Sequence, residues 1–260
     1  MTPADCLAAG QAALRARRLP NGSWPYREGQ RGQVEPTLLA AAAGEPLAEA
    51  WLAGQRRSWP MLLLPAVAMA QAPALSGPVV DWILSATSEI VPGVEDFDAT
   101  LPGWGWVADT APWVEPTAAA VLSLARAGGA ALRVGEGRAL LRDRQCADGG
   151  WNYGNPAAFG VPLDSEPGST AWACMALGAD PAAALGRAWL RAQADWPGSR
   201  GSALAALALL AAGEDAAAAL NALCAAWTAR GLPERSDTLA LGLAALLTAE
   251  GAPHPFFTAP

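Results

Sequence analysis

The sequence predicts an all-α fold, a single α/α toroid in which six helical hairpins form an inner ring and an outer ring. Three observations lead to this prediction: a marker that recurs along the chain, two alternating kinds of helical segment, and the absence of alternating β-branched runs. A chain of 260 residues is long for one small domain, but repeat architectures of this size commonly form one unit. We therefore expect residues 1–260 to form one domain.

Tryptophan marks five of the six repeats. The chain contains 12 Trp, and five of them stand in phrases rich in Gly, Pro, Ser and Asp, at steps of 35, 45, 47 and 45 residues. A Leu in the phrase Gly-Leu-Pro holds the sixth place, 36 residues further on. Periods of this length are typical of helical-hairpin arrays. The six markers are Trp24, Trp59, Trp104, Trp151, Trp196 and Leu232.

The outer helices are predicted before the markers. These segments carry charged residues on one side, as a helix with one face in water does. We expect such helices at residues 4–18, 46–57, 136–144 and 181–193.

The inner helices are predicted after the markers. They are so rich in Ala and Leu that no polar face remains, and a helix that is apolar all round is normally buried. Residues 34–37 and 114–117 both read Val-Glu-Pro-Thr, which suits a helix start because Pro fits the first turn and an acidic residue interacts favourably with the helix dipole. The acidic residues at these starts either serve the helix alone or form an acid ring at a cavity mouth. The expected ranges are 36–43, 60–70, 116–127, 169–177, 202–212 and 237–249.

Composition and charge exclude several functions. The net charge is -7 and all 17 basic residues are Arg, so we expect no nucleic-acid partner. Without Lys, the chain lacks both a Schiff-base residue and a phosphate-loop lysine. The four Cys form no CxxC pair, and no apolar run is long enough for a bilayer of about 30 Å. We expect a soluble, cytoplasmic protein without a cofactor, at most bound to a membrane surface.

The fourth repeat carries the most specific motif. Gly137 and the pair Leu140-Leu141 precede a phrase that runs from Gln145 to Trp151 and has the form QxxxGxW. This phrase resembles the QW repeat of squalene and oxidosqualene cyclases. The phrases at residues 113–117 and 148–154 look like those of the bacterial prenyltransferase and squalene-oxidase repeat proteins. The resemblance implies that the chain is a member of the α/α-toroid superfamily, which contains terpenoid cyclases and protein prenyltransferase β-subunits. It also implies that Gln145 ties into backbone at the next helix end, with Trp151 packed beside it.

The same resemblance implies a squalene- or terpene-cyclase-like protein whose central apolar funnel binds or cyclises an isoprenoid. Class II terpene cyclases protonate their substrate with an Asp of a DxDD motif, because a carbocation can start only from an acid held neutral in a dry cavity. The nearest match here runs from Asp96 to Asp98 and lacks the fourth-position Asp. The candidate catalytic residues are Asp98, Asp96 and Glu115.

Aromatic and acidic residues of the same loops are the candidates for substrate binding. Inner helices that begin at one edge bring their preceding loops together there, so aromatic faces gather at one mouth, where they can hold a cation. The alternative is that these rings simply fill the barrel. The candidates are Trp104, Trp106, Trp113, Trp151, Tyr153, Asp109, Asp164 and Glu166.

Other uses of the fold lead to two further hypotheses. No zinc site is expected, since the only His is His254 and no Asp-x-Cys pair accompanies it. A carbohydrate-active enzyme that uses paired carboxylates in an open aromatic cleft remains an alternative, and so does a non-catalytic toroid that binds lipid or protein. Squalene cyclases pair two barrels, whereas a single barrel must use its own funnel or recruit a second subunit. The sequence leaves the choice between enzyme and binder open.

Overall fold

A computed structural model describes residues 1–55, 73–86, 88, 96–107, 109–128, 130–193 and 198–256. This part of the chain is mostly helical, with 11 helices and two strands of two residues each. The all-α fold class is thereby confirmed. The markers Trp59 and Trp196 and the inner helix expected at residues 60–70 lie outside the described residues.

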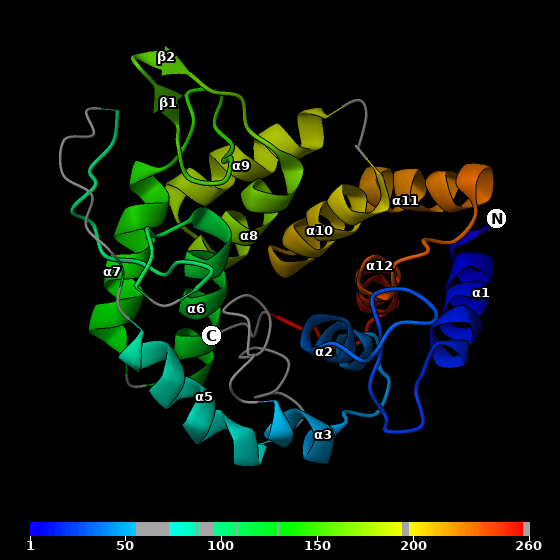
Figure 1. The fold of residues 1–260 in the computed structure, drawn as a ribbon. Coiled ribbons are helices and arrows are strands. Elements are labelled where there is room, and N and C mark those ends of the chain that lie inside the picture. Colours follow the sequence, from blue (N-terminus) through cyan, green and yellow to red (C-terminus); the bar gives the residue numbers. More distant parts are fainter. Residues whose placement is uncertain are drawn as a thin grey trace.

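Five helices rich in Ala and Leu form the buried core. Each packs against the next in the order α2, α12, α10, α8 and α6, as Figure 1 shows. Every residue of α8 is buried, which is the property that its lack of a polar face predicts. All five lie where inner helices were expected. Their bounds are α2 (Val34–Ala42), α6 (Val114–Ala127), α8 (Pro167–Leu177), α10 (Gly198–Ala211) and α12 (Ser236–Ala249).

The remaining helices lie outside this row (Figure 1). Three of them pack against the inner helix that precedes them in the sequence, α7 on α6, α9 on α8 and α11 on α10, whereas α1 packs on α12. Helix α3 is shorter than the helix expected at residues 46–57. No bounds were predicted for the helices before Trp104 and Leu232. The six are α1 (Pro3–Ala16), α3 (Glu49–Gly54), α5 (Pro73–Ser85), α7 (Ala131–Asp143), α9 (Pro181–Ala192) and α11 (Ala217–Arg230).

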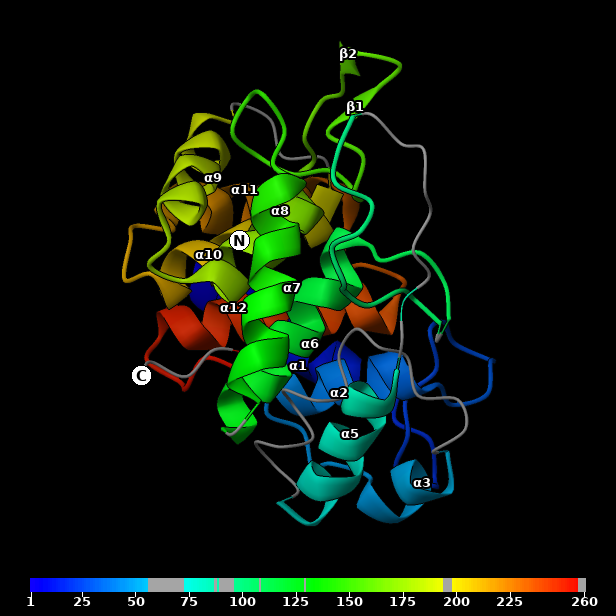
Figure 2. The ribbon, with the colours of Figure 1, turned by 90° about the vertical axis from the view of Figure 1, so that its left-hand side faces the viewer.

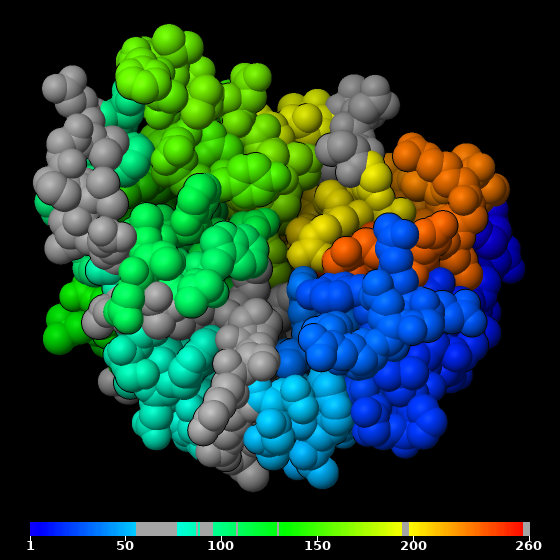
Figure 3. Space-filling model, viewed as in Figure 1, coloured from blue at the N-terminus to red at the C-terminus, as the bar shows by residue number. Residues whose placement is uncertain are grey.

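A short hairpin interrupts the loop before α8. The strands β1 (Ala157–Ala158) and β2 (Val161–Pro162) pair antiparallel and project from one end of the molecule, as Figures 2 and 3 show. No strand was predicted here. The closed toroid stays a prediction, because its sixth inner helix was expected outside the described residues. None of the described helices is both long enough and apolar enough to cross a bilayer.

One hydrogen-bonded module recurs in three repeats and explains the Trp markers. Each of these Trp residues is fully buried, and its indole N–H donates at 2.6–2.9 Å to a carbonyl of the preceding outer helix. The backbone N–H of the same Trp donates at 2.8–3.0 Å to a Thr hydroxyl at the fourth residue of the following inner helix. The module therefore joins the end of an outer helix to the start of an inner one. Its members are Trp24 with Thr37, Trp104 with Thr117, and Trp151 with Thr170.

Gln145 adds a link to the fourth repeat. Its side-chain amide donates to the carbonyl of Gly149 at 2.8 Å and to that of Ala182, in the first turn of α9, at 2.9 Å. Gly186 of α9 lies so close to Trp151 that a Cβ there would stand 2.5 Å from the indole ring. The expected contact of Gln145 with backbone at a neighbouring helix end is confirmed.

Candidate functional site

Four acidic residues gather where the inner helices begin. Glu35 and Asp237 lie in the first turns of α2 and α12, Glu115 lies in the first turn of α6, and Glu166 is the residue before α8. A carboxylate at this position interacts favourably with the partial positive charge of a helix N-terminus. The contacts described below show that the starts of the inner helices converge. We call Glu35, Glu115, Glu166 and Asp237 the acid cluster.

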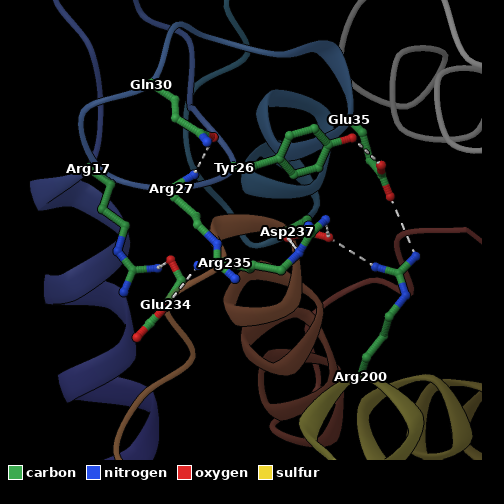
Figure 4. A network of polar contacts seen from close by, with 9 residues as sticks. All are labelled: Arg17, Tyr26, Arg27, Gln30, Glu35, Arg200, Glu234, Arg235 and Asp237. Atoms are coloured by element: carbon green, nitrogen blue, oxygen red, sulfur yellow. Dashed lines mark hydrogen bonds and ion pairs between the residues drawn. The ribbon is translucent and has the colours of Figure 1, made fainter.

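Arg200, in the first turn of α10, joins two members of the acid cluster (Figure 4). Its Nη2 lies 3.4 Å from Oε1 of Glu35 and its Nη1 lies 3.3 Å from Oδ2 of Asp237. Arg235 donates two hydrogen bonds, of 3.0 and 2.8 Å, to the two oxygens of Asp237. Asp237 is only 1% exposed, and its two arginine partners compensate the cost of burying its charge.

Tyr26 is a further partner of the acid cluster on the side of Glu35 and Asp237. Its hydroxyl donates a hydrogen bond of 2.6 Å to Oε2 of Glu35 (Figure 4). Burial and the hydrogen bond to the Glu35 carboxylate raise the pKa of Tyr26 well above its ordinary value. Tyr26 therefore remains a protonated hydrogen-bond donor at neutral pH.

Glu115 and Glu166 are neighbours in the other half. A Cβ on Gly168 would stand 3.2 Å from both carboxylate oxygens of Glu166 and 3.5 Å from Oε1 of Glu115. Glu166 accepts hydrogen bonds from the backbone N–H groups of Gly168, at 2.8 Å, and Ser169, so it caps its own helix. The Glu115 side chain makes no hydrogen bond or ion pair within the part of the chain that the structure describes.

The environment of Glu115 raises its pKa from 4.5 to about 7. Burial of the carboxyl group is the largest cause, the nearby negative charges of Glu166 and Glu35 add to it, and Arg200 opposes it. The helix start favours the ionised form, but burial and like charge outweigh this effect. Glu115 is therefore protonated in about half of the molecules near pH 7.

Two exposed aromatic residues stand beside these carboxyl groups. The backbone N–H of Val114 donates to the carbonyl of Tyr153 at 3.0 Å, which holds the loop of Tyr153 against the start of α6. Tyr153 is 57% exposed, and its pKa is raised, chiefly by the charge of Glu166 and further by burial and Glu115. Trp113, the residue before α6, is also partly exposed. The structure thus brings Glu115, Glu166 and Tyr153 together, with Trp113 adjacent.

Two other aromatic candidates lie in the core. Trp104 and Trp151 are 0% exposed, and each indole N–H is bonded to an outer helix. A side chain with no exposed surface cannot line a mouth, so the expectation that these two residues contact a substrate is corrected. Their hydrogen bonds and burial give them a structural role.

The acids of the imperfect DxDD match lie elsewhere. Asp98 is exposed, and its Oδ1 accepts hydrogen bonds from the backbone N–H of Thr100 at 2.9 Å and from its hydroxyl at 2.6 Å. These bonds hold the pKa of Asp98 below its ordinary value. Asp96 accepts a hydrogen bond of 2.8 Å from the backbone N–H of Gly160 in the β1–β2 turn. Within the described residues, no contact links Asp96 or Asp98 to the acid cluster.

The other candidates are surface residues. Trp106 is 42% exposed, Asp109 is exposed in a left-handed backbone conformation with φ of 60°, and Asp164 is exposed in the loop before α8.

The described residues include no group of three or more His, Cys, Asp or Glu side chains that could hold a metal ion. His254 is packed against α10, with Nε2 at 3.0 Å from the carbonyl of Leu207.

Sequence reasoning did not place Glu35, Asp237, Arg200 and Tyr26 among the site residues. A signal for one of them was present, because the repeated tetrapeptide puts Glu35 and Glu115 at equivalent helix positions. The roles of Arg200 and Tyr26 depend on contacts between distant segments, which no local pattern reveals.

Comparison with known proteins does not assign this chain to a family. No family model matches the sequence, and no curated protein matches it. The functional argument therefore depends on the geometry of the acid cluster.

Proposed function

We propose that the acid cluster is a proton-donating site and that the protein is a terpene-cyclase-like enzyme acting on an apolar isoprenoid. The observation that carries the proposal is Glu115, a largely buried carboxyl group without a protein partner among the described residues and with a pKa of about 7. An effective general acid has a pKa near the working pH, because it is then both protonated and able to release its proton. Burial next to like charges is a common way to reach such a value.

The proposed step is protonation of a carbon–carbon double bond. The Glu115 carboxyl gives its proton to one alkene carbon, the π electrons form the new C–H bond, and the other carbon becomes a carbocation. A second double bond of the substrate attacks this cation and closes a ring. Loss of a proton, to the Glu115 carboxylate or to water, ends the reaction. Substrate and cyclic product are then isomers. The acid is regenerated directly when its carboxylate takes the proton, or by a proton from solvent when water takes it.

Neighbouring residues have supporting roles in this proposal. The positive charge of Arg200 favours the carboxylate that Glu115 becomes after proton transfer, as its lowering effect on the pKa of Glu115 indicates. The exposed rings of Trp113 and Tyr153 offer aromatic faces to a cation beside that carboxylate. The same exposure leaves them open to water, which would capture the cation. A second subunit or a membrane surface over this end would exclude that water.

The α/α toroid belongs to the same proposal. The convergence of the inner-helix starts at the acid cluster supports it, as does the row from α2 to α6 with helices packed outside. A closed ring would place Glu115 at the mouth of a central funnel.

The experiment that tests the proposal is an incubation of purified protein with farnesyl diphosphate, geranylgeranyl diphosphate and squalene, followed by mass spectrometry of the extracts. We expect a cyclic product from one of these substrates, and we expect Glu115→Gln to abolish it because glutamine cannot donate a proton in this way. Glu136→Gln is the matched control, because Glu136 lies on α7 in an ion pair with Arg133. Asp98→Asn should also retain the activity.

Two results would contradict the proposal. One is the absence of product and of binding with all three substrates. The other is a cyclic product that Glu115→Gln still forms at an undiminished rate. Loss of product with Asp98→Asn alone would move the role of proton donor to the loop before Trp104.

A second candidate function follows from the proximity of Glu115 and Glu166. Glycosidases use two carboxyl groups, one protonated and one ionised, whose different environments separate their roles. Glu166, which accepts backbone N–H groups, suits the ionised partner, and Glu115 suits the acid. The two functions can be distinguished with Glu166→Gln, which should abolish hydrolysis of an oligosaccharide but spare isoprenoid cyclisation.

A further inference from the structure

A cavity opens at the other end of the inner helices, away from the acid cluster. Its volume is about 860 Å³, which lies within the range of about 300–1,000 Å³ that is usual for small-molecule sites. It is bounded by the last turns of α6, α8 and α10 and by the outer helices α7 and α9. Because Glu115, Glu166 and Arg200 lie at the starts of α6, α8 and α10, the two sites occupy opposite ends of the same helices.

Much of the wall of this cavity is apolar. Leu122 and Ala125 of α6, Met175 and Leu177 of α8 and Ala211 of α10 line it. These side chains offer no hydrogen bond to a ligand. The cavity therefore suits a ligand with a substantial hydrocarbon part, whose removal from water favours binding.

The polar part of the wall is strongly basic. Arg126, Arg138, Arg142 and Arg187 line the cavity against one acidic residue, Asp180. This local excess of positive charge contrasts with the net charge of -7 of the whole chain. A ligand with a negative charge is therefore favoured over a neutral or cationic one.

Three of these four arginines already have protein partners. Arg138 donates to the carbonyl of Ala176 at 3.2 Å, and Arg187 donates to the carbonyl of Gly178 at 3.0 Å and to Glu214 at 2.7 Å. Arg142 forms an ion pair of 2.8 Å with Asp180. Arg138 and Arg187 thus supply hydrogen-bond donors to backbone carbonyl groups at the end of α8. Together with the ion pairs, these bonds hold the three guanidinium groups in place.

Arg126 differs from the other three. Its guanidinium group makes no hydrogen bond or ion pair within the described residues. Its Nη1 is enclosed by the protein without a partner, so a ligand in the cavity would meet the other atoms of the group. Burial lowers the pKa of Arg126 from its ordinary value, which shows that its charge is partly desolvated. The nearby His254 brings no negative charge, and burial lowers its pKa to about 4, so it is neutral at pH 7. A partly buried cation without a partner is costly for the protein unless a bound anion compensates it.

We infer that this cavity binds a medium-chain monocarboxylate, with the carboxylate on the guanidinium group of Arg126 and the hydrocarbon chain against the Ala, Leu and Met wall. The fork of an arginine matches a carboxylate in a bidentate geometry. One unpaired guanidinium balances one negative charge, which favours a monocarboxylate over a diphosphate. This site is independent of the acid cluster and of the function proposed for it.

The test is isothermal titration calorimetry of the full chain with decanoate, and with decanol and decyltrimethylammonium as the neutral and cationic counterparts. We expect decanoate to bind in one saturable step, and we expect the other two to bind at least about tenfold more weakly because they cannot pair with Arg126. Arg126→Met should weaken decanoate binding about tenfold or more. Arg230→Met, at the exposed end of α11, is the matched control and should leave binding unchanged.

A second variant separates the cavity from the charge. Ala211→Leu keeps Arg126 but fills part of the space, so it should also weaken decanoate binding. Arg126→Met should melt no lower than the unchanged protein, because it removes an unpaired, partly buried charge, so a loss of binding will not reflect unfolding. The inference is overturned if decanoate shows no saturable binding, if decanol binds as well as decanoate, or if Arg126→Met binds as the unchanged protein does.

Discussion

Glu115 stands apart within the acid cluster because the other three members have protein partners. Asp237 is paired with two arginines, Glu35 with Tyr26 and Arg200, and Glu166 with two backbone N–H groups of its own helix. A buried carboxyl group without such partners is expected to hold its proton, since the neutral form avoids the cost of desolvation. At the scale of the residue, a proton-donating site requires this difference between one carboxyl group without a partner and its paired neighbours.

The pKa of Glu115 makes the stability of the protein depend on pH. Between pH 4.5 and about 7 the folded state holds a proton that the unfolded state releases, so the free energy of unfolding falls as pH rises through this window. The cost of ionising the buried Glu115 carboxyl group is fully present above pH 7 and lowers the free energy of unfolding by about 3 kcal/mol. Glu115→Gln should remove it, so urea denaturation at pH 5 and pH 8 should show a smaller difference for this variant than for the unchanged protein. Equal pH slopes for both proteins would show that Glu115 titrates normally.

Asp237 should be the residue of the cluster whose loss costs the most stability. Asp237→Ala leaves Arg200 and Arg235 without their carboxylate, although both guanidinium groups are partly exposed and can recover water. We expect a loss of about 2 kcal/mol in the free energy of unfolding, below the value of about 3–5 kcal/mol that is usual for a fully buried pair. Glu234→Ala is the control, because Glu234 forms an exposed ion pair with Arg27 and should cost under about 1 kcal/mol. Similar losses for the two variants would contradict this assignment.

The sequence predicted part of the site for a physical reason. Glu115 and Glu166 could be found because an acidic residue beside a Pro at a helix start is a local pattern. Asp96 and Asp98 share a local pattern with an acid motif, but only the fold determines whether such residues are buried. Trp104 and Trp151 were assigned to the mouth because loops gather there. Their rings instead turn inward between the two layers of helices, a direction that the sequence does not encode.

At the scale of the element, the inner helices were predictable and two outer ones were not. An Ala- and Leu-rich segment without a polar face has one stable place, the core, and the structure places α2, α6, α8, α10 and α12 there. The outer helices α5 and α11 lack a clear division into charged and apolar sides. In α11 small Ala residues occupy half of the positions, so its sequence shows little periodicity.

In three repeats a buried Trp and a Thr of the next inner helix form the hydrogen-bonded module described above, which we call the Trp–Thr module. It fixes the junction between an outer helix and the following inner helix. Thr117→Val keeps the shape of the side chain but removes the hydroxyl that accepts the N–H of Trp104 at 3.0 Å. The buried N–H then has no partner, which should lower the free energy of unfolding by about 1–3 kcal/mol. Ser123→Ala in the same helix is the control, because the Ser123 hydroxyl only donates back to the carbonyl of Ala119, and its loss should cost less. Thermal unfolding followed by circular dichroism would measure both effects, and equal losses would contradict the role of the module.

At the scale of the whole molecule, charge is divided between the two ends of the inner helices. Carboxyl groups gather at the first turns, and arginines line the cavity at the last turns. Both placements complement the helix dipole, whose N-terminal end is positive and whose C-terminal end is negative. The same helices therefore carry a cluster of carboxyl groups at their starts and an arginine-lined cavity at their ends, each suited to a different ligand.

The packing of α1 on α12 has a consequence for biosynthesis. A ribosome makes α1 before α12, so α1 can pack on α12 only after Ser236–Ala249 has been translated. Leu14 and Gly10 of α1 are buried in the complete protein, and a Cβ on Gly10 would stand 2.8 Å from Leu243 of α12. The nascent chain must therefore expose this apolar face until α12 has been translated, and long-range pairings of this kind form late. Leu14→Ala should accordingly speed unfolding and leave the refolding rate nearly unchanged in stopped-flow experiments, whereas Leu124→Ala, in the sequence-local pair α6–α7, should slow refolding.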